Sequence, residues 1–183
     1  DIQSDVFHFF SCPKLKRRSL NRRHDAVQNG LARYVRSNSC IVSITPKRAD
    51  SKVPDLRVVM ASGAVQVDVS GTHPLAPSIE GKVHGVAGHA LVMRENSKTS
   101  KYKDFAESQG DTFSPFAIES YGGLGEKALD LVKAISEEGA CIDAQSYRFS
   151  KQQFMAWLSV TWQRHNYWAF TEWSRLCQSA RRG

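Results

Sequence analysis

Two aspartates beside adjacent apolar segments are placed to form a metal-binding pair. Asp55 stands directly before the segment LRVVM, and Asp68 lies thirteen residues later, near the end of AVQVDV. If these segments pair as an antiparallel hairpin, the second strand returns to where the first began and brings the carboxylates together. Such carboxylates repel unless a positive charge lies between them, and Mg²⁺ or Mn²⁺ would supply it through oxygen ligands. The alternative is that both acids mark the turns of an ordinary hairpin.

Two lysines further along the chain could provide the cation that a hydrolase needs beside its carboxylates. Lys98 and Lys101 are three residues apart in a segment of helical character, so they lie on neighbouring edges of one helical face. From there, either ammonium could orient or help to deprotonate an attacking water, or neutralise charge developing on a phosphate. The sequence does not choose between them, and an ordinary solvated helix face is the alternative.

A small α/β fold must position these side chains. Apolar residues at helical spacing, with Asp25 as a candidate N-cap, predict helices over residues 25–35, 86–109 and 124–138, and one or two more from residue 151 onward. Runs rich in β-branched residues predict strands at 40–44, 56–60, 64–69 and 112–119. Pro115 places the last of these strands at an edge or a bulge, and residues 71–85 are predicted to form a loop.

The order of these elements predicts a small mixed central sheet flanked by helices. The hairpin strands are antiparallel, whereas the strand reached across the long helix can lie parallel in the same sheet. Side chains alternate along the second hairpin strand, so Val65, Val67 and Val69 share one face. Asp68 lies on the other face, between Gln66 and Ser70.

The pair Pro54-Asp55 followed by Asp68 resembles the PD-(D/E)xK nuclease superfamily, whose members cut DNA with Mg²⁺. That superfamily usually places a lysine two residues after the second acid, where this chain has Ser70. One branch moves the lysine onto the following helix, and residues 98–102 (KTSKY) are similar to the K-x-x-K-Y pattern of the restriction-like endonuclease domain of site-specific non-LTR retrotransposons. Further agreement, over residues 8–138, comes from Arg23-His24-Asp25, Asp68-Val69-Ser70, His73-Pro74, Pro115-Phe116, Glu119 and Tyr121-Gly122-Gly123.

The resemblance implies a restriction-endonuclease-like fold and a metal-dependent DNA endonuclease. Asp55 and Asp68 would be the metal ligands, with Lys98 and Lys101 completing the catalytic set. Further candidates are His24, Asp25, Tyr102 and Glu119. As alternatives, Asp25 caps its helix and Glu119 ends a solvated strand. The family's role is to nick target DNA and free a 3′-hydroxyl for reverse transcription, which implies a nuclear protein within a larger polyprotein that carries the reverse transcriptase.

The charge of the chain favours a nucleic acid as its partner. Lys and Arg number 25 against 18 acidic residues, which gives a net charge of +7 and suits double-stranded or branched DNA. Because basic residues concentrate in 14–23, we expect residues 1–24 to form a basic arm before an α/β core over 25–139; a solvated arm without a partner is the alternative. The residues expected to contact nucleic acid are Lys14, Lys16, Arg17, Arg18, Arg22, Arg23, Arg33, Arg36, Arg164 and Arg175.

The same arm contains His8 and Cys12, which look like the last two ligands of the CCHC zinc knuckle that precedes the nuclease in the resembled family. Structural zinc needs four ligands, and the first cysteine pair is missing, so we expect no zinc in this chain. The arm would then be a remnant of a knuckle. The four cysteines of the chain are scattered, and we expect them to be reduced thiols.

The C-terminal segment, residues 140–183, is predicted to be a helical extension that packs on the core. It holds all four tryptophans: Trp157, Trp162, Trp168 and Trp173. Their spacing nearly repeats one helical face. These rings either pack the extension onto the core or stack on unpaired bases, helped by Arg164 and Arg175.

The sequence has no apolar run of membrane-spanning length and no signal peptide, so we expect no membrane partner. The predicted function is a metal-dependent DNA endonuclease. Two alternatives stay open. One is a catalytically inactive nucleic-acid-binding module on a nuclease fold, which would tolerate Ser70. The other is a branched-DNA resolvase of the same superfamily.

Overall fold

The structure is a computed structural model that describes residues 8–10, 12–45, 53–75, 86–142 and 149–180. Its strands are β1 (Ile41–Ile44), β2 (Leu56–Met60), β3 (Gly63–Thr72) and β4 (Thr112–Glu119). Its long helices are α1 (Asn21–Ser37), α3 (His89–Ser108), α4 (Glu126–Ile142) and α5 (Lys151–Ala180). Three short helical turns precede α1: η1 (His8–Phe10), η2 (Pro13–Leu15) and η3 (Lys16–Leu20).

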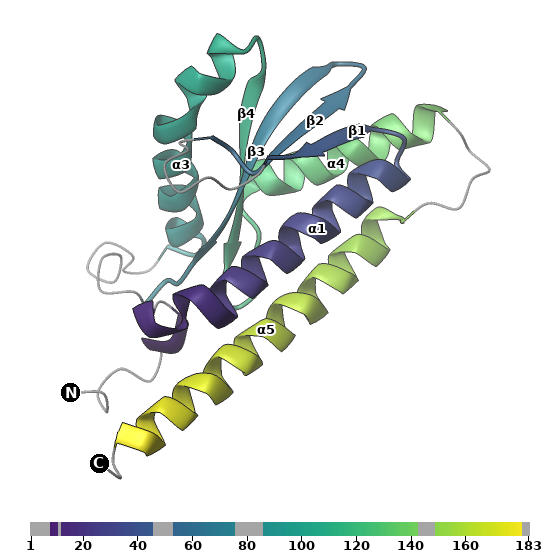
Figure 1. Ribbon diagram of the computed structural model, residues 1–183. Helices are drawn as coiled ribbons and strands as arrows, with labels where there is room; N and C mark the ends of the chain where they lie inside the picture. The colour runs from purple at the N-terminus through teal and green to yellow at the C-terminus, as the bar shows by residue number, and fades with distance from the viewer. Residues whose placement is uncertain (1–7, 11, 46–52, 76–85, 143–148, 181–183) are drawn as a thin grey trace.

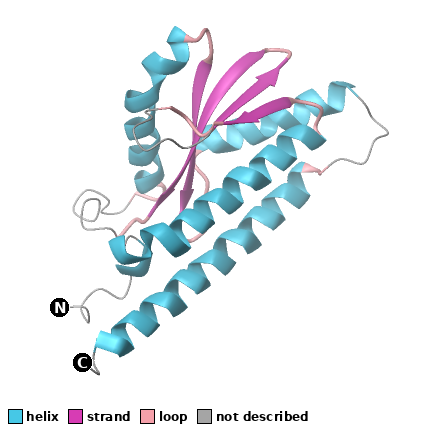
Figure 2. Ribbon diagram, viewed as in Figure 1, coloured by secondary structure: helices cyan, strands magenta, loops and turns pink. Residues whose placement is uncertain are grey.

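The four strands form one open mixed sheet in the order β1-β2-β3-β4. The β1–β2 and β2–β3 pairs are antiparallel, and β4, which follows α3, pairs in parallel with β3. The expected α/β class with a small mixed sheet is therefore confirmed. Pro115 lies in β4 at the edge of the sheet, where its missing N–H breaks no internal ladder. Helices lie on both sides of the sheet (Figure 2).

The apolar face of the sheet packs against α1 and α4. The strands contribute Val58, Val67, Val69, Phe116 and Ile118 to this core. On the facing helices, apolar residues recur every three or four positions, which gives each helix one buried stripe; they include Val27, Leu31, Val35, Leu131 and Ile135. Removing this apolar surface from water is the main stabilisation of the fold.

The polar face of β3 is covered by α3, on the opposite side of the sheet from α1 (Figure 1). Strand alternation places Gln66, Asp68, Ser70 and Thr72 on this face, and all four are buried. Buried polar side chains are costly unless they are paired. Four buried polar side chains in a row beneath α3 therefore indicate a functional site rather than ordinary core packing.

In the described part of the C-terminal extension, helix α5 follows the end of α4 and runs alongside α1 (Figure 1). Phe154, Leu158 and Trp162 on α5 are buried in the main core. The two helices approach closely because Gly30 has no side chain: a Cβ there would overlap the ring of Trp157. Trp168 and Phe170, in contrast, are exposed. The packing prediction thus fits some of the aromatic rings of the extension and not others.

The largest departure from the predicted elements is at the N-terminal side. Helix α1 begins at Asn21, so Asp25 lies inside the helix and the prediction that it is the N-cap is wrong. The boundary expected after residue 24 also falls inside α1. The basic stretch, residues 14–23, is helical, and Leu15 within it is fully buried in a second apolar cluster with Phe9, Cys12 and Ala169 of α5. Apolar residues between the basic ones thus anchor this segment to α5.

Other element boundaries shift by a few residues. Strand β3 continues to Thr72, so the predicted loop begins later, and residues 76–85 of that loop lie outside the described residues. Helix α3 begins at His89 because Gly88 adopts a left-handed conformation with φ 78°, which glycine tolerates best. Helix α4 covers 126–142 rather than 124–138.

Candidate active site

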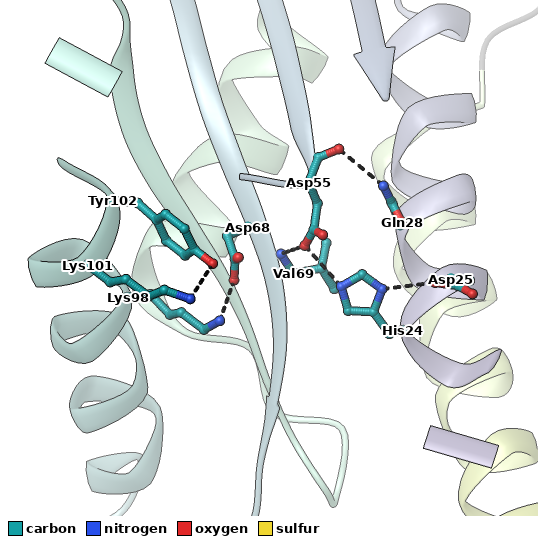
Figure 3. Close-up of polar contacts among 9 residues, drawn as sticks. All are labelled: His24, Asp25, Gln28, Asp55, Asp68, Val69, Lys98, Lys101 and Tyr102. Atoms are coloured by element: carbon teal, nitrogen blue, oxygen red, sulfur yellow. Dashed lines mark hydrogen bonds and ion pairs between the residues drawn. The ribbon is translucent and has the colours of Figure 1, made fainter. Parts of the chain in front are cut away.

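The centre of the candidate site is Asp68, on the polar face of β3. The Lys98 ammonium, on α3, lies 2.8 Å from Oδ2 of Asp68, and Tyr102, on the same helix, also influences this carboxylate. Lys98 and Tyr102 are four residues apart on the helix, so both side chains reach the same spot. Figure 3 shows these two residues and Lys101 approaching the acid from α3.

Burial dominates the electrostatics of Asp68. Its residue surface is only 4% exposed, and this desolvation raises the pKa of the carboxyl. The positive charge of Lys98 and the influence of Tyr102 oppose the rise, whereas the nearby negative charge of Asp55 adds to it. The pKa of Tyr102 is raised to about 12, first by its burial and then by the charge of Asp68. The tyrosine therefore stays protonated.

Lys101 has a different environment from Lys98. Its Nζ lies 2.8 Å from the Tyr102 hydroxyl oxygen, to which it donates, and 4.5 Å from the centre of the tyrosine ring. Lys101 is an exposed residue, whereas the Lys98 side chain is 19% exposed. The structure thus separates the two lysines that the sequence left equivalent, and it places Lys98 on the carboxylate.

Asp55 stands across the hairpin from Asp68. The antiparallel register pairs Leu56 with Val67, so the residue before Leu56 lies opposite the residue after Val67. One carboxylate oxygen of Asp55, Oδ2, accepts a hydrogen bond from the Val69 backbone N–H at 2.8 Å. The register therefore places the two acids opposite each other at one end of the hairpin.

His24 connects this acid to α1. Its Nε2 lies 2.9 Å from Oδ2 of Asp55, and its Nδ1 lies 3.2 Å from Oδ1 of Asp25. The three side chains form a continuous row from α1 to the start of β2 (Figure 3). Asp25, although it does not cap the helix, thus belongs to the wider site through His24. Asp55 is further fixed because Gln28, one helical turn after His24, donates to its backbone carbonyl at 3.1 Å.

The donor set at these positions suits a hard cation. Asp55 and Asp68 offer carboxylate oxygens, and the buried Ser70 hydroxyl, on the same face as Asp68, has no hydrogen-bond partner in the described part of the chain. Oxygen donors of this kind fit Mg²⁺ or Mn²⁺. Among the described residues, no three or more His, Cys, Asp or Glu side chains gather to hold an ion. A cation bound by the two acids would therefore keep several water ligands, as Mg²⁺ commonly does.

Two of the predicted site residues lie elsewhere. Glu119 pairs with Thr72 at the far end of the parallel ladder, whereas Pro115 pairs with Asp68; four residues of strand separate them by about 13 Å. Arg23 is buried: its guanidinium donates to Oδ1 of Asn166 at 2.7 Å and lies 4.3 Å from the centre of the Trp162 ring. The expectation that Arg23 contacts nucleic acid from the surface is therefore wrong, because its side chain joins α1 to α5.

The other predicted nucleic-acid contacts are mostly exposed. The side chains of Lys16 and Arg17 lie outside the described part of the chain. Among the predicted contacts, the exposed residues are Lys14, Arg18, Arg22, Arg33, Arg36, Arg164 and Arg175. Of the two candidate zinc ligands in the N-terminal segment, Cys12 packs among apolar residues of the second cluster, and the His8 side chain is not described.

Sequence reasoning missed a supporting polar group beside the acids. Asp111, just before β4, accepts two hydrogen bonds from Arg57 of β2 at 2.7 and 2.8 Å, and one from Gln66 of β3 at 2.7 Å. This group joins three neighbouring strands next to the face that carries Asp68. The available signal was the alternation of Gln66 with Asp68, which places both side chains on one face.

No protein-family model matches the chain, and no curated protein matches it significantly. None of the described helices combines the length and the apolar character that crossing a bilayer requires.

Proposed function

We propose that the chain is a Mg²⁺- or Mn²⁺-dependent DNA endonuclease with a PD-(D/E)xK restriction-endonuclease-like fold. The observation that carries this proposal is the convergence of Asp55, Asp68 and Lys98 from three separate elements onto one end of the hairpin. The usual lysine position holds Ser70, and the ammonium from α3 takes its place beside the second acid. This is the arrangement that the resembled retrotransposon endonucleases would require.

Each residue has a defined task in phosphodiester hydrolysis. Asp55 and Asp68 would hold the divalent ion, which would supply charge stabilisation and an activated water. Lys98 would donate hydrogen bonds to that water or to a non-bridging phosphate oxygen and so offset the charge that grows in the transition state. The water oxygen forms a bond to phosphorus, the bond from phosphorus to the 3′-oxygen breaks, and the proton lost by the water is balanced by one taken up by the leaving 3′-oxygen.

The exposed basic residues of η2, η3, α1 and α5 would supply affinity for the DNA backbone. Each phosphate that they neutralise releases counterions, so binding should weaken steeply as salt rises. Such contacts position the duplex without reading its sequence. By the same resemblance, the nick would free a 3′-hydroxyl that primes reverse transcription in the nucleus, carried out by a polymerase elsewhere in a larger polyprotein.

A second candidate is a nucleic-acid-binding module that has lost catalysis. It is favoured because both acids already have partners within the protein: His24 and the Val69 N–H contact Asp55, and Lys98 contacts Asp68. Ser70 also agrees with this candidate, because its hydroxyl carries no positive charge and cannot replace the ammonium of a lysine. Such a module would bind DNA through its basic residues and cut nothing.

Plasmid nicking in the presence of Mg²⁺ or Mn²⁺ separates the two candidates. The endonuclease requires that wild-type protein nick the plasmid and that Asp68→Ala reduce the rate roughly 100-fold or more while DNA binding persists. Asp130→Ala, at an exposed acid on α4, is the matched control and should nick normally. Tight, salt-sensitive binding without cleavage under either metal would leave only the binding module. Preference for a four-way junction over plain duplex would instead identify a resolvase.

A further inference from the structure

A groove lies between α5 and the segment formed by η3 and the start of α1. It has a volume of about 1050 Å³ and is bordered by η3, the start of α1 and the C-terminal half of α5. The residues that give it chemical character are Arg18, Arg22, His165, Tyr167, Trp168 and Arg175. None of them contributes to the contacts that hold Asp55 or Asp68, so the groove calls for a separate explanation.

Aromatic rings are exposed in this groove. Tyr167 and Trp168, which are adjacent on α5, are 64% and 46% exposed. The Trp168 ring meets the buried His165 ring edge to face, with 4.7 Å between the ring centres, so one side of the tryptophan is supported. Large rings usually bury most of their surface. Two neighbouring rings left exposed beside a concave surface indicate a ligand with flat faces of its own.

The groove is also positively charged. Arg18, Arg22 and Arg175 border it, and Glu172 is the one acid among its lining residues. Glu172 accepts a hydrogen bond from Ser19 and lies 3.6 Å from Arg18, so it offsets part of one arginine charge. The net charge of the residues that line the groove is therefore positive. Guanidinium groups next to aromatic rings match a chain of phosphates and bases, because each phosphate can pair with a cation while each base stacks.

His165 provides an unpaired polar atom in the same place. Its residue surface is 9% exposed, and its Nδ1 is buried without a hydrogen-bond partner in the described part of the chain. Burial lowers the pKa of His165, and the charges of Arg23, Arg164 and Arg22 lower it further. The ring therefore stays neutral at physiological pH and adds no positive charge of its own beside Trp168.

We propose that this groove binds single-stranded DNA, with unpaired bases stacking on Trp168 and Tyr167 and phosphates contacting Arg22 and Arg175. An unpaired strand fits better than a duplex because only an unpaired strand exposes the ring faces that stacking requires. The choice of DNA rather than RNA rests on the proposed endonuclease function. The groove would then hold a strand that is displaced or frayed near the nick, while the duplex lies at Asp55 and Asp68.

Fluorescence anisotropy with a labelled oligothymidylate of about 15 nucleotides tests the proposal on the full chain. Trp168→Ala should raise the Kd about 10-fold through lost stacking, whereas Trp168→Phe, which keeps a ring, should restore most of the affinity. Arg175→Gln should raise the Kd several-fold and reduce the slope of log K against log salt by about 0.7. Thermal unfolding of each variant checks that it is folded.

Two controls on the same helix match these changes. Val160→Ala trims an exposed apolar side chain outside the groove, and Lys151→Gln removes an exposed charge at the other end of α5. If Trp168→Ala and Arg175→Gln weaken binding no more than these controls, the groove does not bind the strand. Tighter binding of an oligouridylate than of the oligothymidylate, or a loss of duplex affinity in Trp168→Ala as large as its loss of single-strand affinity, would also overturn the assignment.

The same variants distinguish failure of this inference from failure of the proposed function. Plasmid nicking by wild type together with unchanged strand binding in Trp168→Ala would overturn the groove alone. Strand binding that depends on Trp168 and Arg175, without nicking under either metal, would overturn the endonuclease and support the groove. The oligothymidylate measurement is made in EDTA so that cleavage cannot alter the probe.

Discussion

The ammonium of Lys98 lies 2.8 Å from a carboxylate oxygen of Asp68, although the two residues are thirty positions apart and belong to different elements. The acid is buried on β3, and the lysine reaches it from α3. Strand alternation places Ser70, two residues after the acid, on the same face. A lysine at that position would point toward the same face. Because β3 has no lysine there, Lys98 from α3 provides the ammonium beside Asp68.

The first prediction distinguishes the two lysines of the K-x-x-K-Y segment. Lys98→Ala should reduce the plasmid nicking rate about 100-fold, because its ammonium alone lies on a site carboxylate. Lys101→Ala should reduce it less than 10-fold, since Lys101 contacts the Tyr102 hydroxyl and acts on Asp68 only through it. Initial rates at saturating Mg²⁺ measure both effects.

A control for these lysine variants is available on the same helix. Lys103 is exposed and pairs with Glu107 at 3.6 Å, one turn further along α3, so Lys103→Ala should leave the nicking rate unchanged. Equal losses in Lys98→Ala and Lys101→Ala would contradict the separate roles that the contacts give these residues. A larger loss of nicking rate in Lys101→Ala than in Lys98→Ala would mean that the two lysines have the opposite roles.

The second prediction concerns His24, which holds Asp55 from α1. We expect His24 to be a positioning residue, because its Nε2 contacts Oδ2 of the acid and would fix the orientation of the carboxylate. His24→Ala should raise the Mg²⁺ concentration for half-maximal nicking about 10-fold, which is typical of losing a partner behind a metal ligand. His24→Gln, whose amide N–H can still donate to Asp55, should recover part of that loss.

Titration of the nicking rate with Mg²⁺ separates positioning from mere stability. A His24→Ala variant that is folded and needs less Mg²⁺ than wild type would show that the histidine competes with the cation instead of orienting its ligand. An unchanged half-maximal concentration would remove His24 from the site. Both results concern the half-maximal Mg²⁺ concentration, which is determined separately from the maximal nicking rate.

The central hairpin and its two acids could be predicted because their signals are local. Alternation of Val65, Val67 and Val69 fixes the buried face of β3, and the short Ser62-Gly63 turn leaves little freedom in the register. Those two features together place Asp55 opposite Asp68. The long helix and the parallel edge strand followed from length and periodicity in the same way.

The N-terminal region could not be predicted because its structure depends on long-range contacts. Basic residues in sequence read as a solvated run, but Leu15 and Arg23 are buried against α5, more than 140 residues away. Likewise, the pairing of His24 with Asp55 depends on how α1 crosses the sheet. Such contacts between distant segments carry no signature in a single sequence.

The third prediction follows from the burial of Arg23. Its guanidinium lies on the Trp162 ring and donates to Asn166, and burial lowers its pKa to about 10. Arg23→Ala should destabilise the protein by about 2–3 kcal/mol, through the lost cation–π contact and the unpaired Asn166 oxygen. Urea unfolding measures this loss. Arg36→Ala, at an exposed position on the same helix, should change stability by less than about 0.5 kcal/mol. A stable Arg23→Ala protein with weakened DNA binding would show that the side chain serves the nucleic acid instead.

The fourth prediction is a pH dependence of stability that arises from Asp111. Hydrogen bonds from Arg57, and then from Gln66, lower the pKa of this buried carboxyl below its ordinary value of 3.8. The unfolded chain therefore binds a proton more readily than the folded one, so Asp111 stabilises the fold above pH 3.8 and loses this effect as the pH falls through its folded-state pKa.

Asp111→Asn should consequently lower the Tm by a few degrees at pH 7, and the difference from wild type should shrink as the pH falls below 3.8. Thermal unfolding followed by circular dichroism across this range measures the difference. The same substitution at exposed Asp130 controls for the general effect of removing one acid. A Tm difference for Asp111→Asn that is the same at pH 3 as at pH 7 would mean that the neutral hydrogen bonds, and not the charge, join the three strands. In that case the ion pair with Arg57 would add nothing to the support of the face on which Asp68 lies.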